Sequence, residues 1–319
     1  EGALPLFATI LVAQAIWGIG YTFTSGARQA WLADELEDGI GAGRILLKGA
    51  QLEQVGALAG IVLSVVLATI SVALPLIVGG IMFVILAVAL LVIMPERGFS
   101  PTPHINRTSW RDMRTTFAAG VTTTRTHPVL MAIIAIELFT GASSEPFDRL
   151  WTLHMLEIFE FPSPWGLNSL VWFGVIGAVA LLIGTVTTWF IRRIFDVDEP
   201  RTPRRLLTVI NASLIVSTLV FALSGSFALA VPMVIATTVL RRISEPIADV
   251  WLIQHTESAY RATVFSLRGQ ANAFAQVALG PAMGFLAVMS TLRTALVGTS
   301  TLLAPSQVIY ALLGERQRN

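Results

Sequence analysis

The chain has 319 residues, 54% of them hydrophobic and only 13% charged, whereas a soluble domain usually carries about 25% charged residues. Its formal net charge of +1 gives no electrostatic footprint for nucleic acid, so no nucleic-acid partner is expected. The chain contains no cysteine, which excludes a disulfide framework, an iron–sulfur site and a cysteine nucleophile. This composition favours a membrane protein, because lipid solvates an apolar exterior.

Nine membrane-spanning helices are predicted from charge-free runs, since one span needs about 20 apolar residues. The runs are 2–27, 54–95, 128–144 (interrupted by Glu137), 161–191, 206–240, 269–292 and 294–314. Two of them are long enough for two spans each, with breaks near Ser71 and Pro75 and at Ser224-Gly225-Ser226. Strands of a membrane barrel would be about ten residues long. The predicted fold class is therefore an all-α, polytopic membrane helix bundle.

Basic residues fall into alternate connections between these spans. All of the 21 basic residues except Arg149 and Arg293 lie in the first, third, fifth and seventh connections and in the tail. The seventh connection is predicted to hold Arg241, Arg242, Arg261 and Arg268. Because positive charge accumulates on the cytoplasmic side of a membrane protein, we expect the amino end outside and the C-terminus in the cytoplasm.

An internal repeat relates the first spans to the last. A shift of 220 residues aligns two segments that each cover the end of a span, a basic loop and the start of the next span. The paired positions are Trp31 with Trp251, Leu32 with Leu252, Glu37 with Glu257, Lys48 with Arg268 and Gly60 with Gly280. Parallel repeats of this kind are typical of transporters. Spans four to six then lack repeat partners upstream, so the nine spans are predicted to be helices 4–12 of a six-plus-six protein.

The predicted domains follow from this numbering. Residues 1–95 would be the remainder of an N-terminal bundle (helices 4–6), and 128–319 a C-terminal six-helix bundle (helices 7–12). Residues 96–127 would form a cytoplasmic linker. Within it, 108–121 places Trp110, Met113 and Phe117 on one face, which is typical of an interfacial amphipathic helix.

Four segments give the chain a resemblance to the major facilitator superfamily, on its bacterial drug-efflux-like side. They are 18–27 (GIGYTFTSGA), 30–35 (AWLADE), 144–150 (SEPFDRL) and 261–270 (RATVFSLRGQ). The resemblance implies the six-plus-six fold of that family, N-terminally truncated here, and alternating access by two bundles. It also implies a monomeric, multi-pass protein of the bacterial cytoplasmic (inner) membrane that is not an enzyme and has no cofactor.

Glu137 is the sharpest single feature, because it lies near the middle of the fourth predicted span. A carboxylate there is costly unless it is neutral, paired or facing water, and burial favours its protonated form. Glu137, Gly141, Glu145 and Asp148 share one helix face by their spacing, and Arg149 offers a positive partner. The predicted proton-coupling residues are Glu137, Glu145, Asp148 and Arg149. The alternative is a protonated Glu137 that only hydrogen-bonds to a neighbouring helix, and Pro146 is expected to end or kink its helix.

Other polar residues recur at helical spacing within the spans. The predicted substrate-cavity residues are Gln14, Tyr21, Asn272 and Gln276, although packing between helices is an alternative explanation. The predicted gating residues, which would form a charge network, are Arg28, Asp34, Lys48 and Arg268. No metal is expected, since the four histidines lack metal-ligand spacing, and no Walker sequence or nucleophile elbow occurs.

The function predicted from these features is proton-coupled export of a small organic molecule or drug across the cytoplasmic membrane. The expected partners are the lipid bilayer, the substrate and protons. An uptake symporter or facilitator on the same fold is the alternative. A membrane enzyme that acts on lipid is a weaker one, because the acidic residues and His154 at the outer side match no catalytic pattern.

Overall fold

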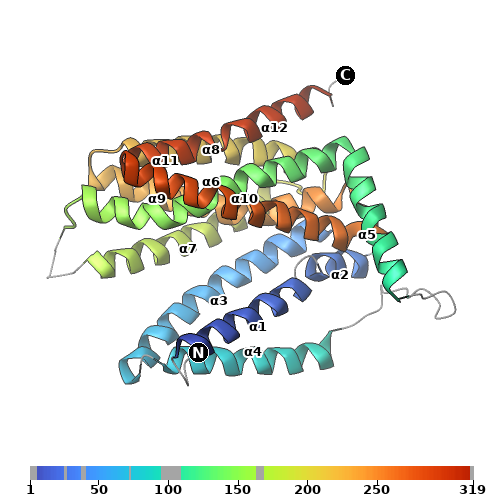
Figure 1. Cartoon of the computed structure of the whole chain (residues 1–319), viewed down its shortest axis with the longest axis horizontal. Coiled ribbons are helices and arrows are strands. Elements are labelled where there is room, and N and C mark those ends of the chain that lie inside the picture. The colour runs from blue at the N-terminus through green and yellow to red at the C-terminus, as the bar shows by residue number, and fades with distance from the viewer. Residues whose placement is uncertain are drawn as a thin grey trace.

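The computed structural model describes residues 6–24, 27–36, 41–71, 73–94, 109–162 and 169–316. Within these ranges all regular structure is helical (Figure 1). The N-terminal helices are α1 (Phe7–Thr24), α2 (Ala27–Glu35), α3 (Ala42–Ile70) and α4 (Leu74–Ile93), and α5 (Ser109–Thr126) follows them. The C-terminal bundle comprises α6 (Pro128–Ile158), α7 (Ser169–Ile194), α8 (Thr202–Leu223), α9 (Phe227–Ile253), α10 (Arg261–Met289), α11 (Leu292–Thr301) and α12 (Ala304–Arg316).

The spans agree with the prediction of an all-α membrane helix bundle. In the described part of the chain, eight helices are long and apolar enough to cross a membrane, and Phe7–Tyr21 is a shorter apolar helix. Both predicted breaks within long runs are confirmed, since separate helices lie on either side of Ser71 and of Ser224-Gly225-Ser226. The ninth predicted span consists of α11 and α12 together. The helix predicted at 108–121 is α5, but the side chains of its first residues, Trp110 and Met113 among them, lie outside the described part.

Three predicted span boundaries are wrong, because the helices continue past the first charged residue. The helix α6 continues through Pro146, α9 runs on beyond Leu240, and α10 begins before Arg268. Arg241, Arg242 and Arg268 therefore lie within helices and not in a connection. Charged side chains are tolerated inside a bundle where they face a cavity or an opposite charge, and two of these arginines pair with acidic residues.

The N-terminal helices meet the C-terminal bundle along the first half of α3. There Gln51 donates a hydrogen bond to the Thr185 carbonyl (3.2 Å) and Gln54 donates one to the Thr188 hydroxyl (3.5 Å), both on α7. Beyond Gln54 most large apolar side chains of α3 are exposed. Figure 1 shows α3 diverging from the bundle toward its C-terminal end, so the two helix groups touch at one end and separate toward the other.

Two clusters of buried apolar residues hold the C-terminal bundle together. One surrounds Trp251 and Tyr310, whose rings lie 5.8 Å apart, and the other surrounds Phe147 and Phe221. The first cluster includes Leu47 of α3, whereas α4 has no buried residue. The start of α3 is thus anchored in the core of the bundle together with Ala33 of α2, whereas α4 is not.

The most extensive contact between helices joins α6 and α10, and Gly141 lies where they approach most closely. A Cβ atom at this position would overlap the carbonyl group of Asn272. The absence of a side chain at residue 141 therefore sets the distance between the two helices that carry most of the polar residues described below.

Replacing Gly141 with Ala is expected to lower the free energy of unfolding by about 1–3 kcal/mol, the usual cost of overpacking a core. Gly177→Ala in α7 is the matched control, because its Cβ would meet no described atom within 4 Å and Ala is the better helix former. Thermal unfolding of both variants in detergent, followed by circular dichroism, measures the difference. Equal melting temperatures for Gly141→Ala and the wild type would contradict the close contact.

Candidate functional site

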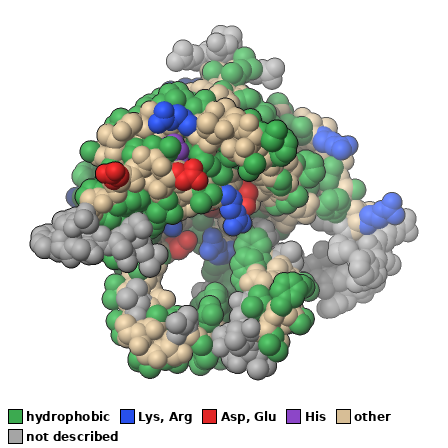
Figure 2. Space-filling model, turned by 60° about the vertical axis from the view of Figure 1, so that its left-hand side comes forward, with side chains coloured by type: hydrophobic (Ala, Val, Ile, Leu, Met, Phe, Trp, Pro, Cys, Tyr) green, Lys and Arg blue, Asp and Glu red, His purple; other side chains and the backbone are tan. Residues whose placement is uncertain are grey.

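A cleft of about 780 Å³ lies between the N-terminal helices and the C-terminal bundle. Helices α2 and α3 form one wall, and α6 and α9 form the other. Its charged and aromatic lining residues are Arg28, Trp31, Glu53, Phe147, Asp148, Trp151, Arg241, Arg242, Glu245 and Asp249. Figure 2 shows a hollow below the main body of the molecule, with acidic and basic side chains along its upper wall. A volume of this size is typical of small-molecule sites.

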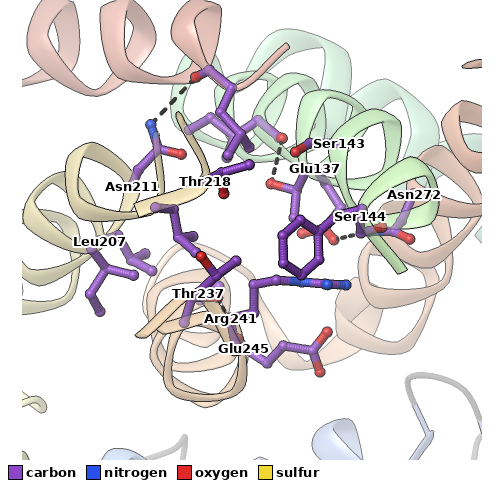
Figure 3. Close-up of a pocket in the computed structure, with 18 of the residues that line it drawn as sticks. Glu137, Ser143, Ser144, Leu207, Asn211, Thr218, Thr237, Arg241, Glu245 and Asn272 are labelled. Carbon is purple, nitrogen blue, oxygen red and sulfur yellow. Dashed lines mark hydrogen bonds between the residues drawn. The ribbon is translucent and has the colours of Figure 1, made fainter. Parts of the chain in front are cut away.

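A second cavity, the inner pocket, has a volume of about 200 Å³ and lies within the C-terminal bundle. Side chains of α6, α8, α9 and α10 converge on it (Figure 3). Its hydroxyl and amide residues include Thr140, Ser143, Ser144, Asn211, Thr218, Thr237, Ser244, Asn272 and Gln276. Such a lining suits ordered water, since one water occupies roughly 30 Å³. The inner pocket therefore has room for several water molecules.

The charge network borders the inner pocket and consists of Glu137, Asp249, Arg268, Asn272 and Gln276. The Arg268 guanidinium donates from Nε to Glu137 (2.7 Å) and from Nη1 to Asp249. Asn272 donates to the second oxygen of Glu137 (2.5 Å), and Gln276 donates to Asn272 (2.5 Å). All three charged residues are buried. One guanidinium therefore joins α6, α9 and α10 through two carboxylates.

Arginine suits this position because its planar fork can serve two carboxylates at once, which a lysine ammonium cannot do with fixed geometry. Burying ions is costly unless each is paired and hydrogen-bonded. Both oxygens of Glu137 accept hydrogen bonds, so the buried Glu137 carboxylate is both paired and hydrogen-bonded. The second oxygen of Asp249 accepts a bond from Gln29 of α2 (3.4 Å). The network thus reaches across to the N-terminal helices.

Gln29 and Asp249, which contact each other, occupy equivalent positions of the two repeats. The two positions are 220 residues apart, which is the repeat shift found in the sequence. Residues at equivalent positions of two repeats touch each other only where they lie close to the axis that relates the repeats. The charge network therefore sits beside the axis about which the two helix groups are arranged.

A second ion pair separates the cleft from the inner pocket. Arg241 of α9 binds both oxygens of Asp148 on α6, at 2.6 and 2.8 Å, and its guanidinium lies 5.7 Å from the centre of the Phe147 ring. Phe147, Asp148, Arg241 and Glu245 line both cavities. This bidentate pair forms part of the wall between the two spaces.

Near α2 the closed end of the cleft is held by polar contacts between α3 and the loop that joins α7 to α8. Asp198 accepts a hydrogen bond from the backbone nitrogen of Gly43 (2.8 Å), at the first turn of α3. A carboxylate is favourable there because helix amino ends carry partial positive charge. A Cβ at residue 43 would lie 2.7 Å from that carboxylate oxygen. Arg44 adds weaker ion pairs to Asp196 (3.8 Å) and Asp198 (3.9 Å).

Three of the four predicted proton-coupling residues come together. Glu137, Glu145 and Asp148 all line the inner pocket, as their shared helix face predicts. Arg149 is largely exposed and pairs with Glu145 at 2.8 Å. The positive partner of Glu137 is Arg268 and that of Asp148 is Arg241. Both arginines were predicted to lie in a connection between spans.

The predicted cavity residues divide between two places. Asn272 and Gln276 line the inner pocket and belong to the charge network. Gln14 and Tyr21 are exposed on α1 and border neither cavity; Tyr21 stacks on Trp17 with ring centres 5.6 Å apart. No residue of α1 whose side chain the structure describes therefore lines either cavity.

The predicted gating residues are also dispersed. Arg268 is the centre of the charge network, Arg28 lines the cleft, and Lys48 is exposed on α3. The side chain of Asp34 lies outside the described residues. The predicted grouping of Arg28 and Lys48 with Arg268 therefore remains a prediction.

Arg241, Glu245 and Asp249 were missed by the sequence analysis as site residues. They recur every four residues, so they share one face of α9. That spacing was available in the sequence. It was overlooked because the predicted span ended at Leu240, and the charges beyond it were assigned to a loop.

Two helix groups that meet over a cleft with charged walls are typical of membrane transporters. No family model matches the chain. The sequence is 21% identical over 314 residues to an uncharacterized MFS-type transporter, YxaM of Bacillus subtilis (strain 168), and the match covers 98% of this chain and 75% of that protein. This relative is a transporter and not an enzyme, in agreement with the prediction.

Solved structures give the same fold. A major facilitator superfamily transporter, FucP, in the outward conformation matches with a TM-score of 0.63 and 16% identity over 90% of this chain and 72% of that one. A variant of the E. coli fucose:proton symporter FucP matches with a TM-score of 0.53 and 16% identity. The match covers 76% of this chain and 56% of the symporter. The human organic anion transporter MFSD10 matches with a TM-score of 0.49, and the chain spans 40% of it. The chain has the fold of the major facilitator superfamily, as predicted, and is a multi-pass membrane protein.

Replacing Arg268 with Gln is expected to destabilise the fold by about 3–5 kcal/mol, because Glu137 and Asp249 would remain buried without their positive partner. Arg242→Gln is the control, since Arg242 is exposed on α9 and makes no ion pair within the described ranges. Thermal unfolding in detergent measures both. If the two variants melt together with the wild type, the network does not stabilise the bundle.

Proposed function

We propose that the chain acts in a proton-coupled secondary transporter that exports a small organic molecule across the bacterial cytoplasmic membrane by alternating access. The observation that carries the proposal is the buried charge network beside the cleft. It ties α6, α9 and α10 together through Arg268, and it contacts α2 of the other helix group through Gln29. A change of charge in the network would therefore act on the contact between the two groups.

The proton would act by changing which ion pairs the network can hold. Arg268 supplies one positive charge to two carboxylates, so the network carries one excess negative charge that a proton can neutralise. A proton taken up by Glu137 would leave Arg268 to Asp249 alone, and the changed charge would act on the contact between Asp249 and Gln29 of the other helix group. The membrane potential adds about 2.3 kcal/mol per charge per 100 mV to such a step.

The arrangement of the two helix groups suits one state of an alternating-access cycle. The groups touch along the first half of α3 and separate beyond Gln54. If the cytoplasmic side is the one predicted from basic residues, the cleft is closed toward the cytoplasm and open outward. The likeness to FucP in the outward conformation supports this assignment. Lipid, protons and a small-molecule substrate would be the only partners of a monomeric transporter.

Four acidic and basic residues would guide the proton between water and the network. Glu137 would exchange the proton, and Glu145 and Asp148 would shape its path along α6, with Arg149 balancing Glu145 at the exposed end. Uptake by symport is the second candidate, because a structural neighbour is described as a fucose:proton symporter. The same network would serve either direction.

Glu137→Gln is expected to reduce proton-coupled transport about tenfold or more, as loss of an essential proton-exchanging group does. The variant should still fold, because Arg268 keeps Asp249 as its partner. Everted vesicles with an imposed proton gradient, a pH-sensitive dye and a panel of organic compounds measure the coupling: exchange of a compound for protons collapses the gradient.

Glu157→Gln is the control for this experiment, since Glu157 is exposed at the end of α6 and borders neither cavity. It should match the wild type. Coupled transport that survives Glu137→Gln would remove Glu137 from the mechanism. Gradient collapse confined to right-side-out vesicles would favour uptake over export.

A further inference from the structure

His127 and His255 lie against each other where α5 joins the C-terminal bundle, outside the apolar spans. Their ring centres are 6.0 Å apart in an edge-to-face arrangement, and both side chains are half-buried. His127 is the single residue between α5 and α6, whereas His255 follows α9 and precedes the short 3₁₀ helix at Ser258–Tyr260. Figure 1 shows α5 running across this end of the bundle. Two titratable rings that are far apart in the sequence thus meet beside the linker.

His127 is the N-cap of α6. Its Nδ1 atom accepts a hydrogen bond from the backbone nitrogen of Leu130 (3.4 Å), so neutral His127 carries its proton on Nε2. Pro128, the first residue of the helix, has no N–H of its own. Protonation of His127 would remove the acceptor and would place a positive charge at a helix amino end, which already carries partial positive charge. The cap therefore requires a neutral imidazole.

His255 is also arranged to be neutral. Its Nδ1 atom lies 2.8 Å from the carbonyl oxygen of Trp251, and because a carbonyl only accepts, this nitrogen carries the proton and donates. Burial lowers the pKa of the His255 imidazole and positive charge on His127 lowers it further, although the Trp251 carbonyl acts in the opposite direction. The His255 ring packs edge-to-face on Trp251, which belongs to the core of the bundle. His255 is thus anchored to the core, and His127 is the member of the pair that adjoins the linker.

No carboxylate balances the two rings within the described residues. The charged and titratable groups at this end of the neighbouring elements are Glu35 of α2, Arg125 of α5, Glu257 and Tyr260 after α9, Arg261 of α10 and Tyr310 of α12. None of these groups acts on His255 electrostatically, whereas His127 does. Two protonated rings at 6.0 Å would repel each other, and half-burial limits the screening of that repulsion by solvent.

We propose that His127 and His255 form a pH switch that fastens α5 to the start of α6 while both rings are neutral and releases it when they take up protons. A proton on His127 removes the cap, and a proton on His255 adds repulsion between the rings. Helix α5 also packs on α10, where a Cβ at Gly120 would lie 2.6 Å from the Thr263 side chain. The switch therefore changes how firmly the linker is attached to the bundle that carries the charge network. It requires no transport activity.

The pH range of the switch follows from the ordinary histidine pKa of about 6.5. Because the cap and the burial of His255 favour neutral rings, protons bind more readily to the opened joint than to the closed one. The joint is therefore most stable above about pH 7 and loses stability as the pH falls below about 6.5. On the topology predicted from basic residues this end faces the cytoplasm, so the switch would respond to acidification inside the cell.

Hydrogen–deuterium exchange of the first turn of α6, in the full chain in detergent, measures the switch. His127→Asn is the test variant, because asparagine is a good N-cap residue that does not titrate. The wild type and His127→Asn should exchange at the same rate at about pH 8. At about pH 5.5 the wild type should exchange about fivefold faster than His127→Asn, as expected for a lost cap. Comparison at equal pH cancels the intrinsic pH dependence of exchange.

His255→Asn and Glu257→Gln are the second variant and the control. Asparagine at position 255 can still donate to the Trp251 carbonyl but carries no charge. At about pH 5.5 its exchange should be slower than that of the wild type and faster than that of His127→Asn. Glu257 is exposed on the same connection, and Glu257→Gln should keep the full response of the wild type.

Equal exchange of the wild type and His127→Asn at about pH 5.5 would overturn the proposal. Loss of the acid response in Glu257→Gln would also overturn it, since Glu257 would then be the titrating group. Both asparagine variants keep the hydrogen bonds of the neutral rings, so their thermal unfolding at about pH 8 should match the wild type. A clearly lower melting temperature there would contradict the hydrogen bonds on which the switch depends.

Discussion

The structure depends on one guanidinium shared by two carboxylates. Arg268 binds Glu137 and Asp249, and so links three helices of the C-terminal bundle. Because buried ions tolerate little misplacement, the helices must approach closely. Gly141 permits this by bringing α6 against the Asn272 backbone. The cleft wall that α6 and α9 present is positioned by this ion pair and this glycine together.

Polar pairing also explains why the cavities lie where they do. The inner pocket is lined by hydroxyls and amides that would be costly to bury dry, and the bidentate pair of Asp148 and Arg241 divides it from the cleft. Among the described residues, Arg241 and Asp249 on this face of α9 have partners on other helices, whereas Glu245 has none. In a low-dielectric bundle an unpartnered carboxylate is tolerated where it meets water or a ligand. The pairing of charged side chains on α6 and α9 therefore determines both the shape of the cleft wall and its charge.

Most of the fold could be predicted from the sequence, because a helix that crosses lipid must be long and apolar, and the breaks at Ser71 and Ser224 interrupt that pattern visibly. Glu137 could be singled out for the same reason. Its partner could not be predicted, since Arg268 is 131 residues away and pairing across helices leaves no local signal. The predicted span ends at Leu240 and before Arg268 were wrong. They assumed that a charged residue must lie outside the membrane, whereas these arginines form ion pairs inside the bundle. The positions of Gln14 and Tyr21 depend on how α1 is rotated, which periodicity does not determine.

The internal repeat shows how two related halves can differ in chemistry. Lys48 and Arg268 are equivalent by the 220-residue shift, yet Lys48 is exposed and Arg268 is buried in an ion network. Gln29 and Asp249 are likewise equivalent and hydrogen-bond to each other, but only one of them can change its charge. A neutral amide facing a carboxylate gives the contact a response to protonation that two amides would lack. Two carboxylates there would repel each other. Because only Asp249 of this pair can be charged, a proton in the C-terminal bundle can change the strength of its hydrogen bond to α2.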